Sequence, residues 1–241
     1  MNPKQASRYA WLEAHLPWLA AAGQQAVWRL DDRGRASRRR LRAMKGGHRG
    51  ERCVIIGNGP SLRGMDLRPL NREKTFTLNR GYLLYDRIGG AAYHVVVNPL
   101  VAEQWAWEIQ SLEATKFSAW GLRRRFARHP EMIYVGGPSR SKTPRFSSDI
   151  TRDIWPGATV TYVAMQIAFY LGFQQVVLIG VDHRFLAPGR PHQEVIQGGD
   201  DTNHFDPNYF GKGTRWNLPD LVTSESAYRL AREAYERDGR Q

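Results

Sequence analysis

Two stretches of this 241-residue chain carry residue types that can bind and activate a substrate. The first, from Cys53 to Asp66, reads CVIIGNGPSLRGMD and joins an apolar run to a glycine-containing loop. Gly57 and Gly59 would let the backbone approach an anionic group closely, and Ser61 can supply a hydroxyl or begin a helix. Because backbone N–H groups in such loops favour anions, the stretch predicts a phosphate site.

This glycine loop departs from two familiar phosphate-binding motifs. The dinucleotide fingerprint needs a third glycine, where Leu62 stands, and an acidic residue about twenty positions on, near Asn79. The Gly-Lys-Ser/Thr sequence of a P-loop is also missing. The sequence therefore argues against NAD binding and against a P-loop nucleotide site.

The second stretch, Gly198–Trp216, reads GGDDTNHFDPNYFGKGTRW and holds one histidine among acidic and aromatic residues. Imidazole side chains titrate near neutral pH, so His204 is the candidate general base. Asp200 and Asp201 also allow a divalent metal site, although their spacing matches no familiar ligand frame. Alternatively, the stretch has only a structural role, as a polar loop that is ordered by the packing of its aromatic residues.

Short apolar runs alternate with helical patterns from residue 52 onward and predict one sheet. Strands are expected at Cys53–Gly57, Thr75–Asn79, Tyr93–Asn98, Lys116–Trp120, Met132–Val135 and Gln175–Val181. Helices are expected at Pro99–Glu113, Val160–Leu171 and Asp220–Asp238. Continuous apolar strands suit a sheet covered by helices on both faces, so the pattern predicts a doubly wound, mostly parallel, Rossmann-like α/β fold.

Polar residues follow four of these strands, at the edge where ligands bind in open α/β sheets. They are Asn58 in the glycine loop, Asn79, Asn98 and Asp182. An asparagine side chain donates and accepts hydrogen bonds without carrying charge, which suits a base, a ribose or a sugar. Residues 183–218 lack clear periodicity, and we expect them to form a lid loop over this site.

The first fifty residues predict a helical, basic N-terminal arm (1–50) before a nucleotide-binding catalytic domain (51–241). Residues 7–30 read as helical, with a break or kink at Pro17. An apolar stripe is expected from Trp11, Leu12, Leu16, Leu19, Val27 and Leu30. Between Arg29 and Arg52, ten basic residues stand against three acidic ones, which places +7 of the chain's net charge of +12 in this segment.

The basic segment has three interpretations. Arg38, Arg39, Arg40 and Arg42 could meet an anionic membrane surface, with about 1 kcal/mol from each charge near the lipid. They could instead form a solvated helix face, or bind nucleic acid. Because more than half of the excess charge is confined to one segment, nucleic acid is the unfavoured partner.

The location of the protein is expected from three further features. No apolar run reaches the length of a membrane span, and Met1–Ala22 lacks the layout of a signal peptide. The single Cys53 rules out a disulfide framework, which fits a reducing compartment. We therefore expect a cytoplasmic protein, with peripheral contact to the inner face of the membrane as an option.

Several motifs occur in the order seen in bacterial sialyltransferases that use CMP-activated sialic acid. They are VIIGNGPSL, Asn79, VNPL, TVTYVAMQIAFYLGFQQVVLIGVD and NHF. The chain equally resembles the MptE-like group, named for an archaeal 6-hydroxymethylpterin diphosphokinase and similar to glycosyltransferases that act on flagellin. GNGPSL and DDTNHFDPNYFGKG resemble most the uncharacterised bacterial members, often encoded near surface-polysaccharide genes. The resemblance runs from about Arg52 to Tyr235, and it implies that related chains continue past the last helix into another strand.

The resemblance implies roles for five residues. Asn58, Asn79, Asn98 and Thr159 would bind CMP, and His204 would act as general base on the acceptor hydroxyl.

Two departures from the sialyltransferase pattern accompany these matches. The family serine after the threonine is Val160 here, and the tyrosines that steady the leaving phosphate have no clear match. Arg184 or Tyr209 would have to replace those tyrosines. These departures weaken sialic acid as the specific donor more than they weaken a CMP-type site.

The residues and the resemblance together predict a glycosyltransferase-like enzyme. It would move a sugar, such as a nonulosonic acid, from a CMP-type nucleotide donor to a glycan or surface-polysaccharide acceptor, with inversion and without an obligatory metal. The expected donor-binding residues are Gly57, Asn58, Gly59, Ser61, Asn79, Asn98, Thr159 and Asp182. One alternative is a pterin diphosphokinase that uses ATP and Mg²⁺ held by Asp182, Asp200 and Asp201; another is a non-catalytic nucleotide-binding protein.

Overall fold

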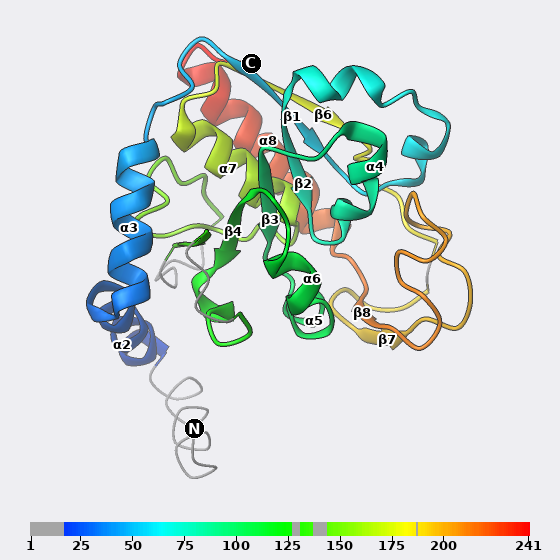
Figure 1. The fold of residues 1–241 in the computed structure, drawn as a ribbon. Coiled ribbons are helices and arrows are strands. Elements are labelled where there is room, and N and C mark those ends of the chain that lie inside the picture. Colours follow the sequence, from blue (N-terminus) through cyan, green and yellow to red (C-terminus); the bar gives the residue numbers. More distant parts are fainter. Residues whose placement is uncertain (1–16, 127–130, 137–143, 187) are drawn as a thin grey trace.

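The structure is a computed structural model that describes residues 17–126, 131–136, 144–186 and 188–241 (Figure 1). The helices are α2 (Pro17–Leu30), α3 (Asp32–Met44), α4 (Tyr85–Ile88), α5 (Pro99–Gln104), α6 (Ala106–Gln110), α7 (Val160–Leu171) and α8 (Leu221–Arg237). Short 3₁₀ helices lie at Pro60–Gly64, Arg68–Arg72, Gly81–Leu84 and Trp120–Leu122. Within these described ranges, no helix combines the length and the apolar character needed to cross a membrane.

Parallel strands form a six-stranded sheet in the order β5-β4-β3-β2-β1-β6. They are β1 (Arg52–Ile56), β2 (Lys74–Leu78), β3 (Tyr93–Val96), β4 (Thr115–Ala119), β5 (Met132–Val135) and β6 (Gln175–Ile179). The chain builds outward from β1 to β5, and α7 then returns it to β6 on the other side of β1. The carboxyl ends of β1 and β6 therefore lie at a topological switch point, where such sheets bind ligands. All six predicted strands are confirmed.

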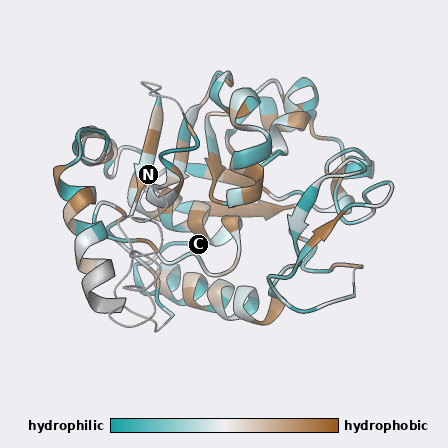
Figure 2. Ribbon diagram, turned by 90° about the horizontal axis from the view of Figure 1, so that it is seen from below, coloured by the Kyte–Doolittle hydropathy of each residue, from teal (hydrophilic) through white to brown (hydrophobic). Residues whose placement is uncertain are grey.

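The strands send alternate side chains into two separate cores, because successive residues of a strand point to opposite faces. Cys53 and Ile55 of β1 pack in the core beneath α7 and α8, whereas Val54 and Ile56 pack beneath the short helices and the lid loop. Figure 2 shows brown, apolar strands at the centre of the molecule and many teal segments around them. Both faces of the sheet are covered, and the predicted doubly wound α/β class is confirmed.

Helix α7 begins and ends at residues that can cap it. Thr159 accepts a hydrogen bond from the Thr161 N–H (3.3 Å), and Gly172 closes the helix in the left-handed conformation at φ +100°. Nearly every residue between these caps is buried, because α7 packs against both the sheet and α8. The predicted bounds of this helix are confirmed.

The two N-terminal helices pack against the rest of the chain at the β5 edge of the sheet. Ser37 of α3 accepts a hydrogen bond from the Tyr134 N–H of β5 (3.0 Å), and Leu41 is fully buried. Trp28 of α2 is buried and donates from its indole N–H to the Thr151 carbonyl (2.9 Å). This packing ties the basic segment to the sheet, and a domain division at residue 50 stays a prediction.

The prediction of an apolar stripe on the first helix is wrong for the two stripe residues whose side chains the structure describes. Val27 and Leu30 are exposed, and Trp28 makes the buried contact instead. Because helical residues one position apart point in different directions, the large indole determines which face of α2 is buried. Pro17 is the first residue of α2, which agrees with the predicted break. Trp11, Leu12, Leu16 and the Leu19 side chain lie outside the described residues.

Two further expectations about local structure are corrected. The helix predicted at Pro99–Glu113 is divided into α5 and α6 at Trp105, whose ring stacks on Phe210 of the lid loop (6.0 Å between centres). The lid loop itself contains two short strands, β7 (Glu194–Ile196) and β8 (Arg215–Asn217), paired antiparallel. Strands of three residues are too short to produce a readable alternation in sequence.

A fully buried histidine on β3 makes stability depend on pH. Burial lowers the pKa of His94 from its ordinary 6.5 to about 3; a backbone hydrogen bond at Asn79 opposes this shift, and the Lys116 charge adds to it. Below pH 6.5 this imidazole therefore binds a proton in the unfolded chain but not in the folded chain. The free energy of unfolding consequently falls as the pH falls from 6.5 towards 3. The expected slope is about 1.4 kcal/mol per pH unit.

Urea unfolding of wild type and His94→Gln between pH 7 and pH 4 measures this slope. The variant cannot titrate at this position, so its curve should be flatter, whatever its stability at pH 7. Parallel curves for the two proteins would contradict the assignment to His94.

Candidate functional site

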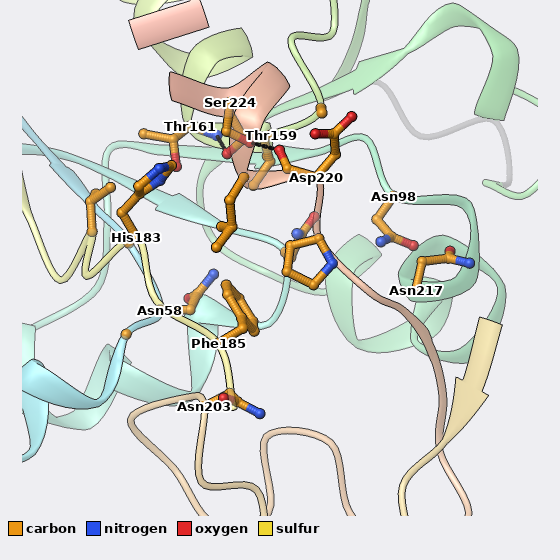
Figure 3. Close-up of a pocket in the computed structure, with 18 of the residues that line it drawn as sticks. Asn58, Asn98, Thr159, Thr161, His183, Phe185, Asn203, Asn217, Asp220 and Ser224 are labelled. Atoms are coloured by element: carbon orange, nitrogen blue, oxygen red, sulfur yellow. Dashed lines mark hydrogen bonds between the residues drawn. The ribbon is translucent and has the colours of Figure 1, made fainter. Parts of the chain in front are cut away.

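A cavity of about 440 Å³ opens at the carboxyl ends of β1, β2, β3 and β6 (Figure 3). Its walls come from the glycine loop, the first residues of α7 and α8, and the lid loop. Most predicted site residues meet there: Gly57, Asn58, Gly59, Asn79, Asn98, Thr159, Asp182, Arg184, His204 and Tyr209. A cavity of this size can hold a small molecule, for which roughly 300–1,000 Å³ is usual.

The glycines of the loop are required by the close approach of two backbone segments. A Cβ on Gly57 would lie 2.2 Å from the Gly180 carbonyl oxygen, and a Cβ on Gly59 would lie 2.8 Å from the same atom. Ser61 does not line the cavity: its hydroxyl and its N–H donate to the Asp182 carboxylate (2.5 and 2.8 Å). The loop is thus held against the end of β6, and Asn58 is the loop side chain at the cavity (Figure 3).

Two amide oxygens at this cavity are buried without a hydrogen-bond partner among the described residues. Asn58 donates from Nδ2 to the Leu78 carbonyl (3.2 Å), which leaves its Oδ1 unpaired. Asn79 sits in the left-handed region at φ +51°, and its Oδ1 is also unpaired. The Trp216 indole N–H, another wall of the cavity, is a buried donor without a partner. Buried polar groups of this kind are normally satisfied, so the set indicates a ligand with both donors and acceptors.

Asn98 and Thr159 begin helices whose N-terminal ends face the cavity. Asn98 accepts at Oδ1 from the N–H groups of Leu100 (2.9 Å) and Val101 (3.2 Å), so its Nδ2 is the group left for a ligand. At α7, Thr159 satisfies the Thr161 N–H, and the buried Thr161 residue also lines the cavity. Helix N-termini attract anions, so the start of α7 is suited to an anionic group.

Asp201 and His204 form a buried pair on the lid loop. His204 Nδ1 lies 2.7 Å from Asp201 Oδ2, and the carboxylate also accepts from the N–H groups of Asn203, His204 and Phe210 (2.9, 3.2 and 3.1 Å). An ionised carboxylate can only accept, so the proton between the two side chains belongs to Nδ1, and Nε2 keeps its lone pair. No described residue hydrogen-bonds to Nε2. A histidine held in this way is suited to act as a base.

Aromatic neighbours fix the orientation of the His204 ring. It stacks on Tyr209 with ring centres 4.0 Å apart and planes 9° apart, and it meets Phe210 and Phe185 edge-on. The Tyr209 hydroxyl accepts from the Arg80 N–H (3.2 Å), and burial raises the pKa of Tyr209, which keeps the phenol neutral. Tyr209 therefore orients the imidazole, and its contact with a phosphate stays a prediction.

Arg63 joins the glycine loop to the lid loop. Its guanidinium donates to the backbone carbonyls of Asp201 (2.9 Å), His204 (2.7 Å) and Phe205 (3.3 Å). In the other direction, the Phe205 N–H donates to the Asn58 carbonyl (2.9 Å). These contacts hold the Asp201–His204 pair beside Asn58 of the glycine loop.

The charged side chains expected at the site differ in exposure and in hydrogen bonding, and they do not form one cluster. Arg184 is exposed at the cavity and forms no ion pair with a described residue. Asp200 is exposed, whereas Asp182 and Asp201 are held by hydrogen bonds within the glycine loop and the lid loop. In the part of the chain that the structure describes, no group of three or more His, Cys, Asp or Glu side chains is placed to hold a metal ion.

Some residues of the site are not evident from the sequence. The sequence presents Asp201 as a metal ligand, and the structure makes it the partner of His204; the three-residue spacing is the signal that could have suggested the pair. Asp220, which caps α8, and Ser224 of α8 reach the cavity from a distant part of the chain, and no local motif marks them (Figure 3). Comparisons with known proteins assign no family: no family model, no curated protein and no solved structure matches this chain.

Proposed function

We propose that this protein is a transferase that moves a sugar from a CMP-type nucleotide donor to a hydroxyl group of a glycan acceptor. The observation that carries the proposal is His204, which is paired with the buried Asp201 and lines the same cavity as the N-terminus of α7. A base and an anion-binding helix end at one cavity are what displacement of a phosphate by a hydroxyl requires.

The neutral polar groups of the cavity support a nucleotide as the ligand. The unpaired oxygens of Asn58 and Asn79 can accept from the amino group of cytosine or from ribose hydroxyls, and the Trp216 N–H can donate to an oxygen. The start of α7 then receives the phosphate. Recognition of this kind needs no charge on the protein opposite the base and no metal at the phosphate.

The proposed reaction uses these groups as follows. His204 Nε2 takes the proton of the acceptor hydroxyl as the acceptor oxygen bonds to the anomeric carbon of the sugar. The bond between that carbon and the phosphate oxygen breaks, and CMP leaves with the electron pair, stabilised by the N–H groups at the start of α7. Attack opposite the leaving group gives inversion at the transferred carbon.

The alternative function is that of a diphosphokinase. It needs carboxylates that hold Mg²⁺ on the phosphates of ATP. Asp201 already accepts four hydrogen bonds, and Asp182 holds Ser61, so these carboxylates would have to give up their present partners. A surface-polysaccharide acceptor and a position at the inner face of the membrane belong to the same proposal.

Ligand-induced thermal stabilisation in the presence of EDTA tests the class of nucleotide. CMP at a hundredfold excess over its Kd should stabilise the protein by about 2.7 kcal/mol, which raises the Tm by about 5–10 °C for a chain of this size. ATP with Mg²⁺ should do less. Stabilisation by ATP with Mg²⁺ alone, with no effect of CMP or CDP, would replace the transferase by the diphosphokinase.

The variant Asn79→Gly tests whether the CMP-induced rise in Tm comes from binding at the cavity. Glycine accepts the left-handed backbone at φ +51° and removes only the side chain, so the fold should persist. Most of the CMP-induced rise should disappear, because one lost hydrogen bond to a buried group costs about 1–3 kcal/mol. Asn71→Ala, at an exposed asparagine away from the cavity, is the control and should keep the full rise.

A further inference from the structure

A second cavity, of about 520 Å³, lies between α2, α3, the end of α7 and the loop that contains Thr151. Five cations line it, against one carboxylate, Asp149: Arg29, Arg38, Arg42, Lys45 and Arg152. Helices α2 and α3 lie on the opposite side of the molecule from β7 and β8 of the lid loop (Figure 1). This basic cavity shares no lining residue with the candidate active site.

Helical geometry selects which of the clustered arginines belong to the cavity. Arg38, Arg42 and Lys45 follow at intervals of four and three residues, so they share one side of α3 and its C-terminal cap. Arg39 and Arg40 lie between them in sequence but do not line the cavity. The run of arginines is therefore divided between faces, and only part of it surrounds a concave site.

Of the five cations around the basic cavity, only Arg152 forms an ion pair with a carboxylate of the described residues. Arg38 donates to the carbonyls of Trp28 (3.2 Å) and Arg29 (2.7 Å) at the end of α2, and its Nε is buried with no partner. Burial lowers the pKa of Arg38, and the charges of Arg42 and Arg29 lower it further. The carboxylate of Asp149 is already engaged with Arg152 and with the Thr151 hydroxyl. Repulsion among the cations is what a bound anion would relieve.

The inner wall of the basic cavity is aromatic and presents a hydroxyl group. Tyr170 is only 3% exposed, and no described residue hydrogen-bonds to its hydroxyl; Lys45 Nζ lies 5.7 Å from its ring centre. Trp28 is 1% exposed, so its ring face is not available for a stacked base. A compact anion fits this wall better than single-stranded nucleic acid, which needs exposed aromatic platforms.

We propose that the basic cavity binds a phosphate-bearing group with at least two negative charges, such as a diphosphate. Arg42, Lys45 and Arg29 approach it from the helices, and the Tyr170 hydroxyl donates from the inner wall. Such a group could come from a soluble compound or from a lipid headgroup, and both sources offer the same chemistry. The proposal is independent of the reaction at the other cavity.

Calorimetric titration of the full chain with inorganic pyrophosphate tests the proposal. Arg42→Gln should weaken binding by about tenfold or more, because a charge-assisted hydrogen bond is lost. Arg39→Gln is the matched control: Arg39 and Arg42 are both exposed residues of the same helix, but Arg39 lies outside the cavity, so this substitution removes no contact with the anion and should leave the Kd within about twofold. Asn79→Gly should have no effect, which separates this site from the candidate active site.

Vesicles identify the source of the phosphate. Phosphatidylcholine vesicles with phosphatidic acid, bound more tightly than pyrophosphate and with the same dependence on Arg42, would assign a lipid headgroup; preference for free pyrophosphate would assign a soluble ligand. The proposal fails if neither probe binds, if Arg42→Gln binds as wild type does, or if Arg39→Gln loses as much. RNA binding weakened equally by both substitutions would also overturn it in favour of an extended nucleic-acid surface.

Discussion

Replacing His204 with alanine should lower the rate of sugar transfer by about 10²- to 10⁴-fold, the usual contribution of a positioned general base. The substitution removes the only group that the proposed reaction uses to accept the acceptor proton. In the proposed function the nucleotide contacts the asparagines and the start of α7 and not His204, so the thermal stabilisation by CMP should remain close to that of wild type. A loss confined to kcat, with nucleotide binding kept, is what distinguishes a catalytic from a structural role.

Asp201→Asn provides a second, independent route to the same result. An amide at this position can donate to Nδ1, which moves the imidazole proton to Nε2 and removes the lone pair that the reaction needs. Transfer should fall by a comparable factor, with the ring still in place. Asp200→Asn, one residue earlier and exposed, is the matched control and should retain wild-type turnover. Normal turnover in His204→Ala, measured with a verified acceptor, would rule out His204 as the base.

The fold could be predicted from the sequence because its signals are local. Buried parallel strands read as continuous apolar runs, as in β1 (RCVII) and β5 (MIYV), and the other strands up to Ile179 each contain at least two apolar residues. Helix α7 carries its own start and stop signals, a threonine cap and a following glycine, so its bounds follow from neighbouring residues. The polar residues after the strands then meet at one edge, which is why the asparagines could be placed together in advance.

The parts that the sequence leaves open depend on contacts between distant segments. The lid loop is held by backbone carbonyls that accept from Arg63, more than a hundred residues earlier, and no pattern encodes that contact. The buried side of α2 depends on one indole that donates to Thr151, against the expected stripe at Val27 and Leu30. Where tertiary contacts decide an orientation, local periodicity does not predict it.

The glycine loop is another case in which a contact between distant segments could not be read from the sequence, and it leads to a prediction about stability. From sequence, its glycines are interpreted as access for a phosphate; in the structure, Gly57 is needed because β1 and β6 end in contact with each other. A Cβ at Gly57 would lie 2.2 Å from the Gly180 carbonyl oxygen and 2.7 Å from its carbon, and both are backbone atoms that cannot rotate away. Gly57→Ala must therefore separate the two strand ends. That movement strains the hydrogen bond from the Gly57 N–H to the Ile179 carbonyl (2.8 Å).

We expect Gly57→Ala to lower the free energy of unfolding by about 3 kcal/mol or more, the upper range for overpacking, with a fall in Tm of about 6–12 °C. Thermal unfolding of the variant beside Gly64→Ala measures it. Gly64 belongs to the same stretch, but a Cβ there meets nothing within 4 Å, so that control should stay within about 1 kcal/mol of wild type. The same movement displaces Asn58, so the Gly57→Ala protein should also bind CMP more weakly. Equal melting temperatures for the two variants would show that the ends of β1 and β6 can part without cost, and the close approach would then not be the reason for the glycine.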